Sequence, residues 1–296
     1  MIQLVFFCKS YIVDLKRFER FWASLKRHNQ ENIPVYVSVP EKDLSVFRSQ
    51  IDDSNQINWL TDQEIAAKSP GGTIRLYDSF DPKFSQQIIK AEVWRLIDCE
   101  NYVCFDSDSV ITRNIYKDDF ISKEGYPYTI MHQHKFFLEQ AAKKNKHKYL
   151  EYFYKESKLL KDFFGRTGLD FEFGPTPCIW SKHVWSDLYE KTLKPKKLTI
   201  WDAFNNIPIE IRWYGEALLK HKSIPLIPIE PLMKAYLYEW QYEGSKKSLI
   251  EDISKLYIGV IYQSNWEYEL DYIQTKSLSS RIVRRIKRSL SQRSLL

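Results

Sequence analysis

The sequence predicts a single α/β domain with a mixed, mostly parallel β-sheet flanked by helices, followed by a short basic tail. Three observations support this prediction. Short apolar runs alternate with amphipathic ones through the first half of the chain, as in strands joined by helical crossovers. The 296 residues are 44% hydrophobic, which is enough to bury a sizeable core. Basic residues without acids dominate from residue 276 onward. We therefore divide the chain into a domain over 1–275 and a tail over 276–296.

Hydrophobic spacing assigns the elements of the first hundred residues. Apolar residues three and four positions apart indicate a helix face, and short apolar runs indicate strands. Asp14 is a residue type that caps helices, and Pro70-Gly71-Gly72 marks a loop. The predicted strands cover residues 2–7, 33–39, 57–60 and 102–105, and the predicted helices cover 15–28, 41–50 and 86–97.

The second half of the chain is less regular. A charged stretch over 135–164 is predicted to be helical, and a loop rich in Gly and Pro follows it as far as Pro177. A later helix is predicted to begin at Glu216. The remaining predictions are strands over 128–131, 224–229 and 257–262, and a strand or turn leading into a helix over 179–193.

The main chemical signal is Asp106-Ser107-Asp108, which directly follows the apolar strand over 102–105. Open α/β sheets bind ligands at the carboxyl ends of their strands, so both carboxylates can turn toward one cation there. Mg²⁺ and Mn²⁺ prefer oxygen ligands and neutralise phosphate charge. The sequence therefore predicts a divalent metal site formed by Asp106 and Asp108. A solvated loop with two acids is the plainer alternative.

Several short segments resemble, in their order and spacing, a known group of enzymes. They are Lys9-Ser10-Tyr11 with Asp14, Val39-Pro40 with Asp43, Gln86-Gln87-Ile88-Ile89-Lys90, Phe105-Asp106-Ser107-Asp108 and Gly215-Glu216. Through most of residues 1–275 the chain resembles bacterial glycosyltransferases of the GT-A type that build lipopolysaccharide or capsule. The resemblance implies a Rossmann-like GT-A fold and Mn²⁺ or Mg²⁺ as cofactor. It also implies transfer of a sugar from a UDP- or GDP-linked donor to a glycan or lipid-linked acceptor.

The resemblance further implies roles for individual residues. In such enzymes the loop after the first strand holds the nucleotide, so Tyr11 would stack on the base. Asp14 would accept a hydrogen bond from the donor or merely cap the helix. Lys90, with Gln87 one turn before it on the same helix face, would reach the donor's phosphate or sugar, and a solvated helix lysine is the alternative. The residues assigned to the donor are Ser10, Tyr11, Asp14, Gln87, Lys90 and Ser107.

Glu216 is the candidate catalytic base. The related enzymes deprotonate the acceptor hydroxyl with a carboxylate at the start of a helix, and Glu216 resembles that acid in position. A helix N-terminus would keep such an acid ionised. Ala217 stands where a second acid is common, so the sequence departs from the pattern here. A surface or capping glutamate is the alternative, and Asp170 and Glu172 are rival acids in the preceding loop.

Residues for the acceptor are expected in the second half of the chain. Sugar rings stack on aromatic faces, which assigns Trp213 and Tyr214 to the acceptor. His132 and His134 follow a predicted strand two residues apart, and we expect them to contact the acceptor or a phosphate. Core aromatics and an ordinary loop histidine are the alternatives. Gln263 and Ser264, just past the last predicted strand, are positional candidates for a third metal ligand.

The net positive charge of the chain comes from its tail. Seven Lys or Arg and no acid lie from Lys276 onward, and the rest of the chain has 37 basic residues against 38 acidic ones. Nucleic-acid binding is therefore not expected. Residues 277–296 are predicted to form a basic amphipathic helix on an anionic membrane surface, with a disordered tail as the alternative.

The sequence also suggests a location. No apolar run reaches the roughly 18 residues of a membrane span. Residues 2–7 read as a buried strand and not as a signal peptide, and the four cysteines form no C-x-x-C pair. We expect a cytoplasmic protein with reduced thiols, peripheral on the inner face of the membrane.

Two other functions stay open at this point. Haloacid-dehalogenase-type phosphatases also carry an apolar strand followed by Asp-x-Asp, in which Asp106 would be the nucleophile and Asp108 the acid/base. Their motif lies on the first strand, however, whereas about a hundred residues precede it here. The other alternative is a non-catalytic, membrane-associated sugar-binding protein, against which the intact acidic pair argues.

Overall fold

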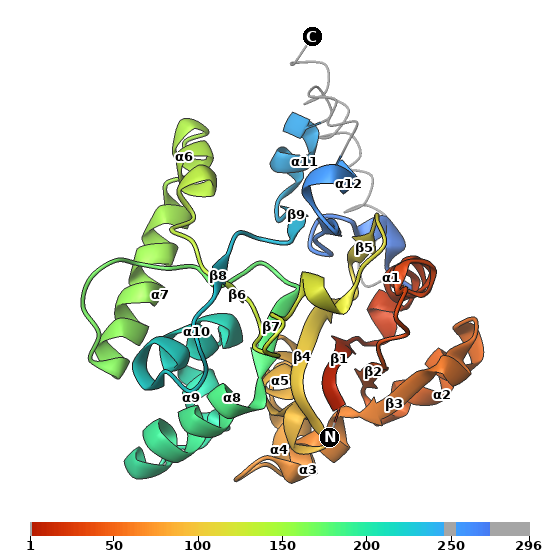
Figure 1. Ribbon diagram of the computed structural model, residues 1–296, viewed down its shortest axis with the longest axis horizontal. Helices are drawn as coiled ribbons and strands as arrows, with labels where there is room; N and C mark the ends of the chain where they lie inside the picture. Colours follow the sequence, from red (N-terminus) through yellow and green to blue (C-terminus); the bar gives the residue numbers. More distant parts are fainter. Residues whose placement is uncertain (1, 246–252, 273–296) are drawn as a thin grey trace.

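The computed structural model describes residues 2–245 and 253–272, which are built around a five-stranded sheet (Figure 1). Its strands are β1 (Ile2–Lys9), β2 (Val35–Val39), β3 (Ile57–Thr61), β4 (Cys99–Asp106) and β7 (Cys178–Ser181). They lie in the order β3-β2-β1-β4-β7. The first four strands are parallel, and β7 is antiparallel to β4. The predicted fold class, a mixed and mostly parallel sheet flanked by helices, is confirmed.

Both faces of this sheet are covered by helices, which is why its strands are apolar on both sides. Side chains of β1 alternate between two cores. Phe6 packs with helices α1 (Leu15–His28) and α2 (Glu41–Gln50), and Phe7 packs with the helices on the opposite face. Helices that contribute to this second core are α3 (Asp62–Lys68), α5 (Pro82–Glu92), α8 (Lys182–Asp187), α9 (Ile200–Asn206) and α10 (Glu210–His221), and α4 (Ile74–Ser79) packs beside α3.

A second, smaller sheet lies beyond the carboxyl end of β4. The chain turns at Ser107 and Asp108 into β5 (Ser109–Ile111), which is antiparallel to β10 (Gly259–Tyr262). Strand β10 in turn pairs in parallel with β9 (Met233–Tyr236). This sheet brings the segment after Tyr262 next to the acidic motif, although about 150 residues separate the two along the chain.

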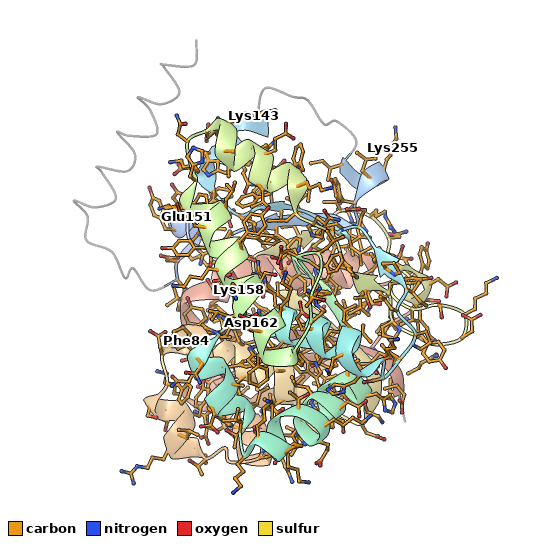
Figure 2. The ribbon with its side chains drawn as sticks, turned by 90° about the vertical axis from the view of Figure 1, so that its left-hand side faces the viewer. Phe84, Lys143, Glu151, Lys158, Asp162 and Lys255 are labelled. Atoms are coloured by element: carbon orange, nitrogen blue, oxygen red, sulfur yellow. The ribbon has the colours of Figure 1, made fainter. Side chains whose placement is uncertain are left out.

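The stretch over 135–164, predicted as one helical segment, forms two helices, α6 (Lys135–Lys143) and α7 (Lys148–Phe164). Asn145 between them adopts a positive φ of 54°, which an α-helix cannot contain. Gly165 ends α7 in the left-handed conformation. Figure 2 looks onto α7, which runs along the outer surface of the molecule.

Helix α10 begins six residues earlier than the sequence predicts, at Glu210 instead of Glu216. The predicted strand over 224–229 is reduced to β8 (Pro228–Ile229), which pairs with β6 (Thr129–Ile130). Two short helices complete the described chain, α11 (Glu239–Ser245) and α12 (Ile253–Leu256).

Within residues 2–245 and 253–272, no helix has both the length and the apolar character that a membrane crossing requires. The four cysteines are buried and free, as expected for structural thiols. The predicted amphipathic helix of the tail over 276–296 lies outside the described residues.

Candidate active site

The carboxyl ends of β1 and β4 bring two short loops together. Lys9, the last residue of β1, is in register with Asp106, the last residue of β4. The loop after β1 continues to Tyr11, and the loop after β4 continues to Asp108. The two loops therefore lie at the edge of the sheet where open α/β proteins bind ligands.

Lys90 of α5 and Asp106 form a short ion pair at this edge. The Lys90 ammonium lies 2.5 Å from Asp106 Oδ1 and 3.4 Å from Glu210 Oε1. Thr176 donates its hydroxyl to Asp106 Oδ2 at 2.6 Å. Burial favours a higher pKa for Asp106, but the Lys90 charge and these hydrogen bonds outweigh it and lower the pKa. Burial favours a lower pKa for Lys90, but the charges of Asp106 and Glu210 raise the pKa well above its ordinary value. Both groups of the pair are therefore ionised at neutral pH.

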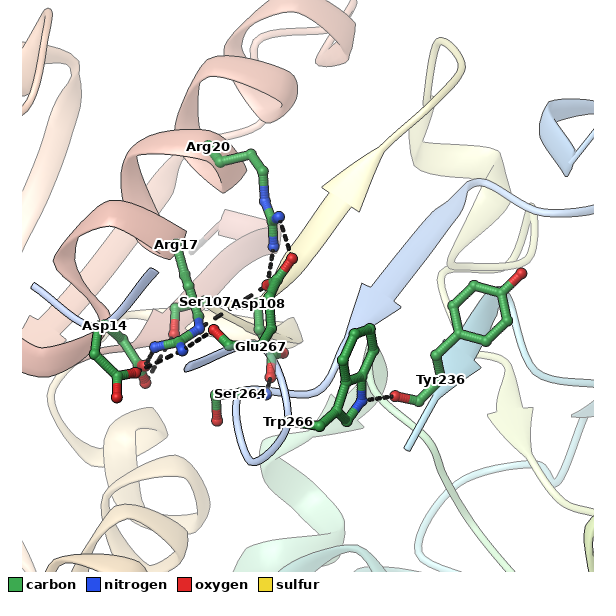
Figure 3. Close-up of polar contacts among 10 residues, drawn as sticks. Asp14, Arg17, Arg20, Ser107, Asp108, Tyr236, Ser264, Trp266 and Glu267 are labelled. Carbon is green, nitrogen blue, oxygen red and sulfur yellow. Dashed lines mark hydrogen bonds and ion pairs between the residues drawn. The ribbon is translucent and has the colours of Figure 1, made fainter. Parts of the chain in front are cut away.

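Asp108 is buried and, unlike Asp106, forms no ion pair with any described residue. Its Oδ2 accepts a hydrogen bond from the backbone N–H of Ser264 at 2.8 Å (Figure 3). Its Oδ1 is buried and has no hydrogen-bond partner. Burial, together with the charge of Asp106, raises the pKa of Asp108 to about 8. Asp108 is therefore a buried acid without a cationic partner among the described residues, an arrangement that proteins usually avoid.

The oxygens of Asp106 and Asp108 suit a divalent cation. The two oxygens of Asp106 offer about four acceptor positions, and Lys90 and Thr176 use two of them. A cation beside Asp108 would satisfy the orphaned Oδ1, and carboxylate oxygens are preferred by Mg²⁺ and Mn²⁺. No cluster of three or more His, Cys, Asp or Glu suited to a metal is present in the described part of the chain. The remaining coordination positions would fall to a bound ligand and water.

Two adjoining cavities meet at the Lys90–Asp106 pair and form one cleft. We call them the Asp108 half, of about 150 Å³, and the Glu172 half, of about 230 Å³. Lys90, Asp106, Glu210 and Gln263 line both halves. The Asp108 half is further lined by Lys9, Tyr11, Asp14, Gln86, Gln87, Ser107, Asp108 and Ser264. The Glu172 half is further lined by His134, Glu172, Gly174, Pro175, Thr176, Ile211, Leu237 and Ile261.

The structure gathers most of the predicted donor residues in the Asp108 half. Ser10 is the exception, because it is buried, lies outside the cleft lining, and its hydroxyl has no hydrogen-bond partner. Tyr11 stays 37% exposed, and the Lys9 ammonium lies 5.9 Å from the centre of its ring. The predicted donor residues that line this half are Tyr11, Asp14, Gln87, Lys90 and Ser107.

Asp14 stands at the N-cap position of α1, but the prediction that it caps the helix needs correction, because its side chain makes no capping hydrogen bond. Its Oδ1 pairs instead with Arg17 at 2.5 Å. The Ser107 hydroxyl lies 3.5 Å from its Oδ2. Burial raises the pKa of Asp14, and Arg17 opposes that rise. Asp14 thus links the wall of the cleft to Arg17, which is fully buried.

Arg17 and Arg20 fasten the segment after β10 to helix α1 (Figure 3). Arg17 donates to the Glu267 carbonyl and to Asp271 Oδ1, the latter at 2.6 Å. Arg20 binds both carboxylate oxygens of Glu267, at 2.6 and 2.7 Å. These contacts hold Ser264 against Asp108. Both positional candidates for a third ligand, Gln263 and Ser264, therefore lie in the Asp108 half.

The Glu172 half contains two buried glutamates. Glu172 pairs with Arg212 at 2.7 Å; burial favours a higher pKa, but Arg212 outweighs it and lowers the pKa. Glu210 is the first residue of α10 and lies beside Lys90. Burial raises the pKa of Glu210, and Lys90 opposes that rise. Glu210 is thus a carboxylate at a helix start that lines the cleft, the position expected for Glu216 from the sequence.

Glu216 itself lies outside the lining of both halves. Arg166 grips its carboxylate with two hydrogen bonds of 2.5 and 2.6 Å, and the side chain is buried. This geometry corrects the expectation that Glu216 is the base, because its oxygens are occupied by a structural partner. Asp170, a rival acid, pairs with Lys161 at 2.6 Å and is also absent from the cleft lining.

Three of the residues predicted to bind an acceptor have structural roles. Trp213 and Tyr214 are 1% and 2% exposed and belong to the main hydrophobic core, which corrects their assignment. His132 Nε2 donates to the Gly174 carbonyl at 2.7 Å, and its Nδ1 accepts from the His134 backbone N–H at 3.2 Å. His132 thereby supports the loop that lines the Glu172 half, and His134 is the histidine in the lining.

The chain belongs to DUF6492, a family of unknown function whose profile matches residues 2–241. No curated protein sequence matches it. Among solved structures it is similar to mouse xyloside xylosyltransferase 1 in its apo form, with a TM-score of 0.47 and 8% identity over 88% of this chain and 98% of that one. It is also similar to the apo structure of the bifunctional glycosyltransferase WbbM, with a TM-score of 0.46 and 10% identity over 88% of this chain and 45% of that one.

Proposed function

We propose that the protein is a metal-dependent glycosyltransferase that moves a sugar from a nucleotide-sugar donor to the hydroxyl of a glycan or lipid-linked glycan acceptor. One observation carries the proposal. A buried acid without a positive partner, Asp108, lies at the carboxyl edge of the sheet, in a cleft that continues into a second cavity. A diphosphate-bearing donor with a divalent cation would occupy the Asp108 half, and an acceptor would occupy the Glu172 half. The sugar would then lie at their junction.

Asp106 and Asp108 would hold Mn²⁺ or Mg²⁺ through their carboxylate oxygens. When bound, such an ion neutralises the charge that develops on a diphosphate leaving group. Lys90 adds a fixed positive charge at the junction, where it can bind a phosphate oxygen or a sugar hydroxyl. Asp106 holds the Lys90 ammonium in place. Tyr11, at the open side of the Asp108 half, offers a ring on which a nucleotide base can stack.

Glu210 is the proposed base. It lines both halves, so an acceptor hydroxyl in the Glu172 half can reach it next to the sugar. Burial strengthens it as a base by raising its pKa, and Lys90 favours its ionised form. The proton of the acceptor hydroxyl passes to the Glu210 carboxylate while the acceptor oxygen bonds to the anomeric carbon. The bond from that carbon to the diphosphate breaks, and the nucleoside diphosphate leaves with the electron pair.

The wider setting is proposed from the sequence. A UDP- or GDP-linked donor, a role in surface polysaccharide synthesis and a position on the inner face of the membrane all follow from the resemblance and from the basic tail. The tail over 276–296 would contact anionic lipid.

Purified protein tests the proposal directly. Thermal-shift screening of UDP- and GDP-sugars with and without Mn²⁺ should find a donor that raises the melting temperature only with the metal. Product analysis with that donor should show nucleoside diphosphate and transferred or hydrolysed sugar. Phosphate release from simple phosphomonoesters instead would support the haloacid-dehalogenase-type alternative, with Asp106 as nucleophile.

A double substitution separates the enzyme from a non-catalytic sugar-binding protein. Asp106→Asn with Asp108→Asn keeps the size of both side chains and removes their charge. In a metal-dependent transferase it abolishes turnover while folding survives. An unchanged biological role in cells that carry the double variant would contradict the proposal.

A further inference from the structure

The tip of the α6–α7 hairpin is a concentrated basic surface. Residues 143–148 comprise four lysines, one histidine and one asparagine, without an acid, and all six are exposed. Lys143 pairs with Glu139 at 2.7 Å. None of the other three lysines pairs with an acid among the described residues. The tip therefore presents positive charge that, apart from Glu139, no acid in the described part of the chain neutralises.

Two large apolar side chains are strongly exposed on helices α6 and α12. Leu256 of α12 is 73% exposed and Phe136 of α6 is 65% exposed, the two highest values among large hydrophobic residues in the described chain. The ammonium of Lys234 lies 5.7 Å from the centre of the Phe136 ring. A single exposed apolar residue is ordinary. Apolar anchors combined with lysines are typical of surfaces that enter the interface of a membrane.

The position of these helices relates them to the cleft. Helices α6 and α12 lie at the upper end of the molecule in Figure 1, beyond the carboxyl edge of the sheet. Lys143 of α6 and Lys255 of α12 are labelled at the same end in Figure 2. His134, which directly precedes α6, and Leu237, which lies between β9 and α11, line the Glu172 half. A surface that binds this end is thus brought to the side of the cleft assigned to the acceptor.

We propose that this end, formed by residues 143–148 with Phe136 and Leu256, docks on an anionic lipid membrane. The lysines bind anionic headgroups, and the two apolar side chains enter the interface. Each lysine near an anionic leaflet strengthens binding about fivefold. That the docked end would serve an acceptor carried on a lipid rests on the proposed function, whereas the docking itself does not. A membrane is favoured over a soluble polyanion because a polyanion would leave Phe136 and Leu256 without a partner.

Vesicle binding by the full chain tests the docking. Sedimentation with vesicles of equal parts phosphatidylcholine and phosphatidylglycerol is compared with vesicles of phosphatidylcholine alone. Replacing the four lysines of the tip by glutamine should weaken binding to the anionic vesicles at least about tenfold. The matched control replaces four exposed lysines on the connection between α8 and α9, which lie at the lower end in Figure 1. These are Lys191, Lys194, Lys196 and Lys197.

The control changes the total charge equally, and the tail is present in every variant, so only the position of the charge differs. Equal loss in both variants, or no loss in the tip variant, would overturn the proposal. A second variant, Phe136→Ser with Leu256→Ser, should weaken vesicle binding and leave binding to dextran sulfate unchanged. Loss of dextran sulfate binding alone in the tip variant would assign the tip to a polyanion and also overturn the proposal. No donor or acceptor is present, so failure of the proposed sugar transfer would not affect the result.

Discussion

The two halves of the cleft differ in whether their acidic side chains have cationic partners. Both glutamates of the Glu172 half have a cationic partner, because Glu172 pairs with Arg212 and Glu210 lies beside Lys90, which it shares with Asp106. In the Asp108 half, Asp108 has no cationic partner among the described residues, and its Oδ1 accepts no hydrogen bond from them. A cavity whose acids have cationic partners suits a neutral hydroxyl compound, whereas a buried acid without such a partner must hold a proton or bind a cation. We therefore propose that the Asp108 half takes a cation with its anionic partner and that the Glu172 half takes the acceptor.

The largest effect is expected from Asp108→Asn, which removes the carboxylate that has no cationic partner. Asparagine keeps the shape but withdraws the charge, so Mn²⁺ binding should be lost and sugar transfer should fall by about a thousandfold. Folding should survive, because a buried acid without a partner is removed and not created. Calorimetric Mn²⁺ titration and initial rates measure both. Asp118→Asn, at an exposed aspartate, is the control. Unaltered Mn²⁺ affinity in Asp108→Asn would show that the Asp108 carboxylate does not bind the metal.

The next largest effect should separate Glu210 from Glu216. Glu210→Gln is expected to lower kcat by about a hundredfold or more, with a small effect on the KM for the donor, because the general base is lost. Glu216→Gln weakens only the contact with Arg166, so it should cost about 1–3 kcal/mol of stability and leave kcat of the folded enzyme intact. Steady-state kinetics and urea unfolding of both variants give the answer. A large loss of kcat in Glu216→Gln alone would return the role of base to Glu216.

The Asp108 half was largely predictable from the sequence because of how it is built. Its acidic pair follows directly on an apolar strand, and its other residues come from the loop after the first strand and from the helix before the motif. Strand ends of a parallel sheet meet at one edge, so local patterns fix which residues gather there. Ser10 shows the limit, since neighbours in a loop point in different directions and only Tyr11 reaches the cleft.

The Glu172 half was not predictable in the same way. Its base candidate depends on where one helix begins, and the apolar periodicity of α10 did not locate that start. Pro208, two residues before Glu210, is the signal that could have moved the boundary. Aromatic residues such as Trp213 serve cores and sugar sites alike, so composition cannot assign them. Ion pairs such as Glu216 with Arg166 join residues 50 apart and exist only in the folded chain.

The pKa of His134 shows whether the Glu172 half excludes water. Burial lowers its pKa from 6.5 to about 4. Between these values the unfolded chain binds a proton that the folded chain does not, so stability falls as the pH drops from about 6.5 to about 4. His134→Asn should remove this loss, which is about 3 kcal/mol. Asparagine tolerates the positive φ of 56° at this position. Urea unfolding across this pH range measures it, and equal pH profiles for both proteins would mean that His134 is hydrated and titrates normally.

The smallest effect concerns Tyr11, at the open side of the Asp108 half. Its ring is 37% exposed, so Tyr11→Ala removes little packing and should change stability by well under about 1 kcal/mol. Loss of a stacked base should weaken donor binding by up to about tenfold and leave kcat nearly unchanged, because the contact is made equally before and during reaction. Tyr126→Ala, at a tyrosine of similar exposure away from the cleft, is the control. A fall in kcat without a change in donor affinity would place Tyr11 at the reacting sugar, and the nucleotide would then have to occupy the Asp108 half in the opposite direction.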